Sequence, residues 1–450
     1  MENVNSFTEG GIVKPLIKFS IPLMMALLLQ ALYGGVDLII VGQFGNTASV
    51  AAVAIGSQIM QAITGIITGL TMGVTVLIAQ YMGAKKKEKI SDVVAALIKL
   101  FSIISIVVTL IMVIFAKQIG FLMKVPAEAF QQTVNYIRIC SMGTIFIVAY
   151  NAISGIFRGM GNSKLPLLFV FIACIVNIVC DFIFVGVFKL DSSGAALATV
   201  LAQAVSVVCS VIFLRKNKSI VNVKKHNFKN NGAYIKQILK IGGPIALQDS
   251  LTTVSFLIIT SIMNSIGLVA SACAGISGKI FIFLAIIPMA FMSALGAIVA
   301  QNVGAGKEKR AIAIFKTTTL ISMACGVVMF LLTYFKGAML ASIFEKNTEV
   351  IKATAEYLKS CSVEYILVST YFCCLGYFNG IGKTTFVMLQ GLASAFLVRI
   401  PLSYYLSRIP NVDFFTLGLS VPISALFSVI ACFIYFFMIK KKRVKSEKLI

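Results

Sequence analysis

The run QALYGGVDLIIVGQFGN occupies residues Gln30–Asn46 and is apolar enough to lie in a lipid bilayer. It nevertheless carries a carboxylate, Asp37, near its middle. An ionised carboxylate at the centre of a bilayer costs roughly 2.5–3.5 kcal/mol even on the insertion scale that penalises it least. Because of this cost, a carboxylate within a membrane helix usually binds a partner such as an ion or a polar group.

The composition of the whole chain agrees with a membrane location. Of the 450 residues, 59% are hydrophobic and only 12% are charged, whereas soluble domains average about 25% charged residues. The mean hydropathy is +0.97. A net charge of +23 would suggest nucleic acid as the partner of a soluble protein. Here the basic residues fall almost entirely between apolar runs, so we expect contact with membrane lipids and none with nucleic acid.

Apolar runs of the length that a spanning helix needs, about 20 residues, occur twelve times. We therefore predict an all-α polytopic membrane protein with twelve transmembrane helices in two six-helix repeats. The approximate limits of the runs are 15–42, 48–80, 93–116, 130–157, 165–188, 194–214, 236–264, 268–302, 311–335, 351–378, 384–407 and 414–439.

The distribution of basic residues between the spans predicts the orientation. Most of the 39 lysines and arginines lie in loops on one side, including the linker after the sixth span and the C-terminal tail. Because cytoplasmic loops carry the excess of Lys and Arg, both termini should be cytoplasmic. An even number of spans agrees with this. We expect a multi-pass protein of the cell membrane and a monomer.

The linker RKNKSIVNVKKHNFKNNG separates two halves that resemble each other. Ala79-Gln80-Tyr81-Met82-Gly83-Ala84 matches Ala300-Gln301-Asn302-Val303-Gly304-Ala305, an offset of 221, and Pro22 matches Pro244 at 222. Two copies with an even number of spans have the same orientation, an arrangement known in transporters with a site at the repeat interface. The predicted division is a lobe at 1–214, a cytoplasmic linker at 215–235, a second lobe at 236–440 and a basic tail at 441–450.

Polar residues within the spans of the first half form the predicted ion site. Asp37 and Asp181 lie 19 and 17 residues from Lys18 and Lys164 at the cytoplasmic side, so at ~1.5 Å per residue both lie ~25–28 Å deep. Asn177 shares a helix face with Asp181. Counting from the loops brings two further side chains to this layer, namely Asn151 and Thr199.

This set of oxygen donors suits either of two ions. A hard cation such as Na⁺ could bind Asp37, Asn177 and Asp181, or a proton could be shared between the carboxylates. No other cofactor is expected. The alternative is a polar packing network without a ligand, although two acids lacking a basic partner are hard to explain in that way. At an offset of 222 the equivalent of Asp37 is Ile259, so we expect the ion in one lobe only.

The second half carries charges of both signs within its spans. Glu364 and Arg399 lie 17 and 18 residues either side of Ile381, so a hairpin of two spans would place them level and pair them. Asp249 and Lys279 are further candidates for lining a cavity. In span 2, Gly65, Gly69 and Gly73 have the spacing that lets helix backbones pack closely, and we interpret them as packing residues.

At these residues the chain resembles the multidrug and toxic compound extrusion (MATE) transporters. The matching segments cover essentially the whole chain: Tyr33–Gly42, the similar ends of spans 2 and 8, Arg158–Gly161, Asn177–Asp181, Gly194–Gln203 and Arg399–Leu402. The resemblance implies two six-helix lobes around a central cavity and efflux of organic cations in exchange for H⁺ or Na⁺.

The resemblance also assigns ion-site positions to individual residues. In the branch with an N-terminal-lobe site they fall on Asp37, Asn151, Asn177, Asp181 and Thr199. In another branch the seventh span carries an acidic ligand. The best-aligned residue here is Thr252, with Asp249 a turn away, which makes a second site in the C-terminal lobe doubtful.

We therefore expect a secondary active multidrug efflux transporter that exchanges cationic or amphipathic small molecules for H⁺ or Na⁺ by alternating access. One alternative is a lipid-linked oligosaccharide flippase of the same superfamily, which would have extra spans and a cavity rich in Arg and Lys. Another is an uncoupled channel or membrane scaffold. An enzyme is disfavoured because no nucleophile–base pair or metal cluster occurs among the spans.

Overall fold

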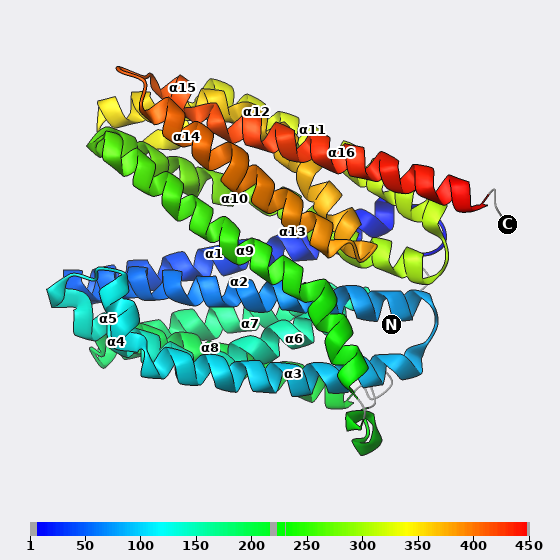
Figure 1. Ribbon diagram of the computed structural model, residues 1–450. Coiled ribbons are helices and arrows are strands. Elements are labelled where there is room, and N and C mark those ends of the chain that lie inside the picture. Colours follow the sequence, from blue (N-terminus) through cyan, green and yellow to red (C-terminus); the bar gives the residue numbers. More distant parts are fainter. Residues whose placement is uncertain (1–6, 217–222, 230, 448–450) are drawn as a thin grey trace. The chain divides into compact units, whose positions relative to one another are not determined.

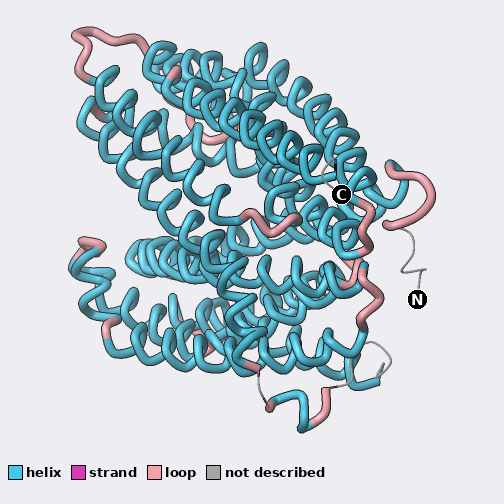
Figure 2. Tube along the Cα trace, turned by 45° about the vertical axis from the view of Figure 1, so that its right-hand side comes forward, coloured by secondary structure: helices cyan, strands magenta, loops and turns pink. Residues whose placement is uncertain are grey.

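The computed structural model describes residues 7–216, 223–229 and 231–447, and within these ranges the chain is helical without strands (Figure 2). The first half contains α1 (Val13–Phe44), α2 (Thr47–Gly83), α3 (Lys87–Ile114), α4 (Ala116–Leu122), α5 (Ala127–Met142), α6 (Thr144–Gly159), α7 (Lys164–Asp181), the π-helical segment η2 (Phe182–Val187) and α8 (Asp191–Lys216). A short 3₁₀ helix, η3 (Lys225–Phe228), follows.

The second half repeats this pattern with its breaks at other places along the chain (Figure 1). It contains α9 (Gly232–Ile266), α10 (Leu268–Gly304), α11 (Glu308–Ser342), α12 (Thr348–Gly380), α13 (Thr384–Leu392), the π-helical segment η4 (Ala393–Arg399), α14 (Ile400–Ser407), α15 (Phe414–Gly418) and α16 (Ser420–Glu447). Eleven helices of the described residues are long and apolar enough to cross a membrane, or twelve when one bent pair is a single span. The predicted all-α polytopic fold is confirmed.

The bent pair is the span predicted as one run at 130–157. It is broken at Gly143 into α5 and α6, which meet at an angle of 48°. A Cβ at Gly143 would lie 2.4 Å from Cγ2 of Val200 on α8, so only glycine permits this close approach. The hydroxyl of Thr109 on α3 donates to the Ser141 carbonyl over 3.0 Å, which satisfies a backbone group next to the bend.

By packing, the chain divides into two compact units. Of the described residues, the first unit holds 7–10, 17–216, 223–229, 231–246 and 300–307. The second unit holds Gly11–Leu16, Leu247–Val299 and residues 308–447. The predicted division into lobes stays a prediction, because residues 217–222 and 230 of the linker and 448–450 of the tail lie outside the described residues.

The beginning of α9 packs in the first unit through glycines. A Cβ at Gly69 on α2 would lie 2.5 Å from the Ala246 Cα, and a Cβ at Gly73 would lie 2.6 Å from the Gly242 nitrogen. A Cβ at Gly65 would meet nothing within 4 Å. The packing role expected for this glycine series therefore holds for its second and third members.

Two apolar clusters hold the helices of the first unit around the predicted ion site. Ile40 and Val41 of α1 pack with Val53 of α2 and with Ala195 and Ala196 of α8. This cluster holds α1, which carries Asp37, against α2 and α8. A larger cluster joins α2, α3 and α6 beneath it, through residues that include Val74, Leu77, Val93, Leu97 and Ile156. Because lipid tails are as apolar as these side chains, the clusters stabilise the helix contacts through close van der Waals packing rather than through removal from water.

In the second unit α12 is the central helix. It packs along α11 and also contacts α15 and α16. Tyr357 and Cys361 on α12 form a buried cluster with Met263 of α9, Cys273 of α10 and Leu406 of α14. This cluster places Glu364, one turn further along α12, among the same helices.

Candidate ion-binding site

Three helices of the first unit bring four of the predicted site residues together. Asp37 lies on α1, Asn177 and Asp181 lie one turn apart at the end of α7, and Thr199 lies on α8. The two acids and the amide are almost fully buried, with exposed fractions of 4% for Asp37, 1% for Asn177 and 0% for Asp181. The hydroxyl of Thr199 donates to Oδ2 of Asp37 over 3.4 Å, and Asp37 also interacts with the side chains of Asp181 and Asn177.

Most polar atoms of this cluster lack a conventional hydrogen-bond partner. Among the described residues, no partner is found for Oδ1 of Asp37, for either carboxylate oxygen of Asp181, or for either amide atom of Asn177. Buried polar atoms are paired in more than about 90% of cases, and an unpaired one costs about 1–3 kcal/mol or more when charged. Within the described residues neither acid forms an ion pair with a basic side chain. The cluster therefore has the donor set and the open valences of a site for one small cation or a shared proton.

The backbone changes character at this cluster. The α-helix α7 ends at Asp181, and the π-helical segment η2 begins with the next residue. Segments of π-helix are rare and occur frequently at functional sites, because the extra residue per turn re-aims the side chains around it. The sequence NIVCDFIFVG has no Gly or Pro between residues 177 and 185 that would have predicted this change.

Asn151 is placed differently from the other predicted ligands. Its amide nitrogen donates to the carbonyl of Ile147 on its own helix, α6, over 2.8 Å. Its amide oxygen lies 3.5 Å from the Thr68 hydroxyl of α2. Counting residues from Lys164 predicts its depth in the membrane but not the direction in which it points.

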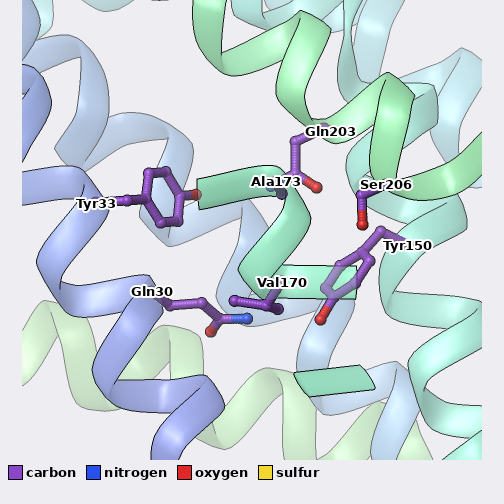
Figure 3. A pocket seen from close by; sticks show the side chains of 7 residues that line it. All are labelled: Gln30, Tyr33, Tyr150, Val170, Ala173, Gln203 and Ser206. Carbon is purple, nitrogen blue, oxygen red and sulfur yellow. The ribbon is translucent and has the colours of Figure 1, made fainter. Parts of the chain in front are cut away.

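A small pocket beside the cluster was not expected from the sequence. It is lined by side chains from four helices, Gln30, Tyr33, Tyr150, Val170, Ala173, Gln203 and Ser206 (Figure 3). Its volume of about 10 Å³ is roughly the space that one water molecule needs. Tyr33 interacts with both Gln203 and Asp37, so it joins the pocket to the ion cluster.

Helical spacing could have identified these additional polar residues. Tyr33 precedes Asp37 by four residues on α1, and Gln203 follows Thr199 by four on α8. Residues four apart lie on one face of a helix. The polar face of each helix thus continues for one turn beyond the predicted ligand.

The charged candidates of the second unit are placed in three different environments. The guanidinium of Arg399 lies 3.1 Å from Oε1 of Glu364, and both side chains are largely buried. Lys279 is exposed, with its ammonium 5.8 Å from the ring centre of Phe344. Asp249 is exposed on α9 near Tyr371 of α12. Among the described residues no group of three or more His, Cys, Asp or Glu side chains could hold a metal ion.

An all-helical membrane protein built from two repeats, with a buried polar layer in one of them, has an architecture known among transporters. The MatE family model matches this chain twice, over residues 22–183 and again over 244–405. The chain therefore belongs to the MATE family, whose members are transporters and not enzymes. The two matches also confirm the internal repeat, with an offset of 222 residues.

Curated relatives support the same family, and solved structures support the fold. The chain is 26% identical over 431 residues to the probable multidrug resistance protein YpnP of Bacillus subtilis, covering 96% of both chains. It is 23% identical to the multidrug export protein MepA of Staphylococcus aureus, covering 87% of both. A MATE transporter in the bent conformation superposes with a TM-score of 0.93 at 21% identity and 99% coverage of both chains. A transporter from Pyrococcus furiosus, described as having a binding pocket of reversed polarity, superposes with a TM-score of 0.91 at 21% identity, covering 97% of this chain and 98% of that one.

Proposed function

We propose that this multidrug transporter is an antiporter driven by H⁺ or Na⁺, and that the ion binds between Asp37 and Asp181. The observation that carries the proposal is the pair of buried carboxylates, which have no basic partner among the described residues and are surrounded by unpaired polar atoms. One bound cation would neutralise part of this charge and would provide the missing contacts. The amide of Asn177 and the hydroxyl of Thr199 would complete the shell.

Alternating access follows if the ion prefers one of two states. A ligand shifts a conformational equilibrium only by the difference between its affinities for the two states. External ion bound at Asp37 and Asp181 would favour the outward state, in which the drug leaves. Return to the inward state would then require the ion to be released to the cytoplasm.

The substrates proposed are amphipathic or cationic small molecules, as the names of the multidrug relatives suggest. The chain contains 34 Phe residues, which offer large apolar surfaces, and 18 Met residues, whose side chains adapt to varied apolar shapes. We place the protein in the cell membrane as a monomer, with both termini in the cytoplasm. A lipid-linked oligosaccharide flippase is the weaker proposal, because it predicts more spans than the eleven or twelve of the described residues.

The experiment is ethidium efflux from membrane vesicles, with a pH gradient and a Na⁺ gradient imposed separately. The gradient that drives efflux in the wild type identifies the ion. Asp37→Asn should reduce ion-driven efflux at least about tenfold, because loss of a charged ligand costs about 1.5–3 kcal/mol.

A matched control is Asp413→Asn, which makes the same chemical change at an exposed residue preceding α15. We expect it to transport like the wild type. Ion-driven efflux that persists in Asp37→Asn vesicles would rule out the proposed site.

A further inference from the structure

The two repeats can be compared residue by residue at the ion layer. The two family matches begin and end 222 residues apart, and at this offset Asn177 corresponds to Arg399, Asp37 to Ile259 and Asp181 to Ser403. The second repeat therefore lacks both carboxylates of the first. At this level of the membrane the second repeat instead carries the cationic side chain of Arg399. Arg399 occupies the position that Asn177, a proposed ligand, has in the first repeat.

Glu364, which pairs with Arg399, also differs from its counterpart in the first repeat. In the region of Tyr136 and Cys140, which match Tyr357 and Cys361, the offset is 221, so Glu364 corresponds to Gly143. In the first repeat Gly143 is the point at which α5 and α6 bend against Val200. In the second repeat α12 continues as one helix through Glu364. The second repeat has thus gained an acid and a base together.

The acid and the base form a buried pair in the second unit. Nη2 of Arg399 lies 3.1 Å from Oε1 of Glu364, with exposed side-chain fractions of 15% and 6%. The ring of Phe256 on α9 covers the guanidinium at 5.0 Å from its centre, a geometry that favours a cation. Because an arginine is not deprotonated in proteins, this positive charge is permanent.

Stability alone is a poor reason for such a pair. A buried ion pair is often no more stabilising than apolar residues of the same volume, because desolvation offsets the attraction. The pair is also incompletely satisfied, since the buried Nε of Arg399 has no hydrogen-bond partner in the described part of the chain. The pair lies at the position equivalent to the ion site. A role for its positive charge explains this position better than a contribution to stability does.

We propose that Arg399 is a fixed internal cation, which takes in the second repeat the place that the exchangeable cation takes in the first. Glu364 is its permanent counter-ion. The second unit then binds no coupling ion, and each chain exchanges the ion at one site only. This inference rests on the proposed function, since it assumes that the cluster of Asp37 and Asp181 binds an exchangeable ion.

The first test removes the pair as a whole. The double variant Arg399→Gln with Glu364→Gln replaces both charges by neutral side chains of similar size. If the pair holds no exchangeable ion, the number of ions moved per drug molecule in reconstituted vesicles stays at the wild-type value. A lower ratio in the double variant would overturn the inference, because it would make Glu364 a coupling residue.

The second test asks whether a new site can be opened. In an Asp37→Asn, Asp181→Asn background, the single change Arg399→Gln leaves the Glu364 carboxylate without its counter-ion. Purified protein should then regain binding of one ion, read as ²²Na⁺ retained or as protons taken up in weak buffer. Arg399→Lys keeps the fixed charge and should regain none, and the same holds for the double neutral variant. No binding by a folded Arg399→Gln protein would contradict the inference.

These outcomes separate the inference from the function on which it rests. If Asp37→Asn keeps ion-driven efflux, the proposed ion site is wrong, whatever the Arg399 variants do. If Asp37→Asn abolishes efflux and the double neutral variant changes the ratio of ions to drug, only the fixed-cation inference fails. If the single variant does not fold, the transport ratio of the double variant still decides.

Discussion

Asp37 and Asp181 occupy one buried layer with an amide and a hydroxyl, and no described basic side chain pairs with either acid. Two like charges at short range repel in a medium of low dielectric, which is why we propose that the layer takes a proton or a cation from outside the protein. The fixed ion pair of Glu364 and Arg399 has no such requirement. The proposed coupling rests on this contrast between two acids without a basic partner and an acid that is already paired with an arginine.

Thr199 should tune the affinity of the site without being essential. Its hydroxyl donates one long hydrogen bond, 3.4 Å, to Asp37. Removing such a bond costs about 0.5–1.5 kcal/mol. Thr199→Val should therefore raise the half-saturating ion concentration for drug efflux by up to about tenfold, and Thr199→Ser should leave it near the wild-type value. Equal values for the Val and Ser variants would contradict a ligand role for this hydroxyl.

The two acids should act as one unit. If a single ion bridges them, removing either carboxylate already abolishes the site, and removing the second adds little. Ion-driven efflux rates of Asp37→Asn, Asp181→Asn and the double variant should therefore be similar. Independent sites would instead give losses that multiply in the double variant.

At the scale of the helix, glycines set where neighbouring backbones meet. Gly73 of α2 contacts the backbone of α9 so closely that an added Cβ would lie 2.6 Å from the Gly242 nitrogen, whereas Gly65 has open space. Overpacking a close contact costs about 1–3 kcal/mol. Gly73→Val should lower the thermal unfolding midpoint in detergent, and Gly65→Val should change it little. A similar loss in both variants would point to helix propensity as the cause.

The helix η3 should be held on α3 by one acidic side chain. Nδ2 of Asn227 donates to Oδ1 of Asp92 over 2.7 Å, and the Tyr234 hydroxyl donates to Oδ2 over 3.4 Å. Asp92→Ala removes both acceptors, so trypsin should cleave after Lys224 faster than in the wild type. Asp191→Ala, an acid at the start of α8, serves as the control. Unchanged cleavage would show that Asp92 does not hold this segment.

Helix boundaries could be predicted where local sequence determines them. They could not be predicted where contacts with other helices determine them. The apolar runs predict most helix ends to within a few residues, because each run must satisfy its own backbone in lipid. The largest differences, six to eight residues, are at the start of α3 and at the ends of α11 and α16. The bend at Gly143 depends on the approach of Val200, which no local pattern encodes. The same applies to the π-helical segments after Asp181 and before Ile400, and to the orientation of Asn151.

At the scale of the whole molecule, the duplication is visible in the sequence and in the double match to the family model. The same comparison shows that the two copies differ in their polar layers. Asp37 corresponds in sequence to Ile259, and Asn177 corresponds to Arg399. The fold therefore retains its repeat, whereas the charges that would couple transport to an ion remain in the first copy.

Reverse coupling tests the central claim most directly. If the ion drives the drug, a drug gradient must drive the ion, because the coupling free energy between two ligands is reciprocal. Vesicles with equal H⁺ and Na⁺ on both sides and a gradient of ethidium alone should accumulate or release one of these ions against the drug flow. Asp37→Asn vesicles should show none of this ion movement. Drug flow in the wild type without any ion movement would contradict the account.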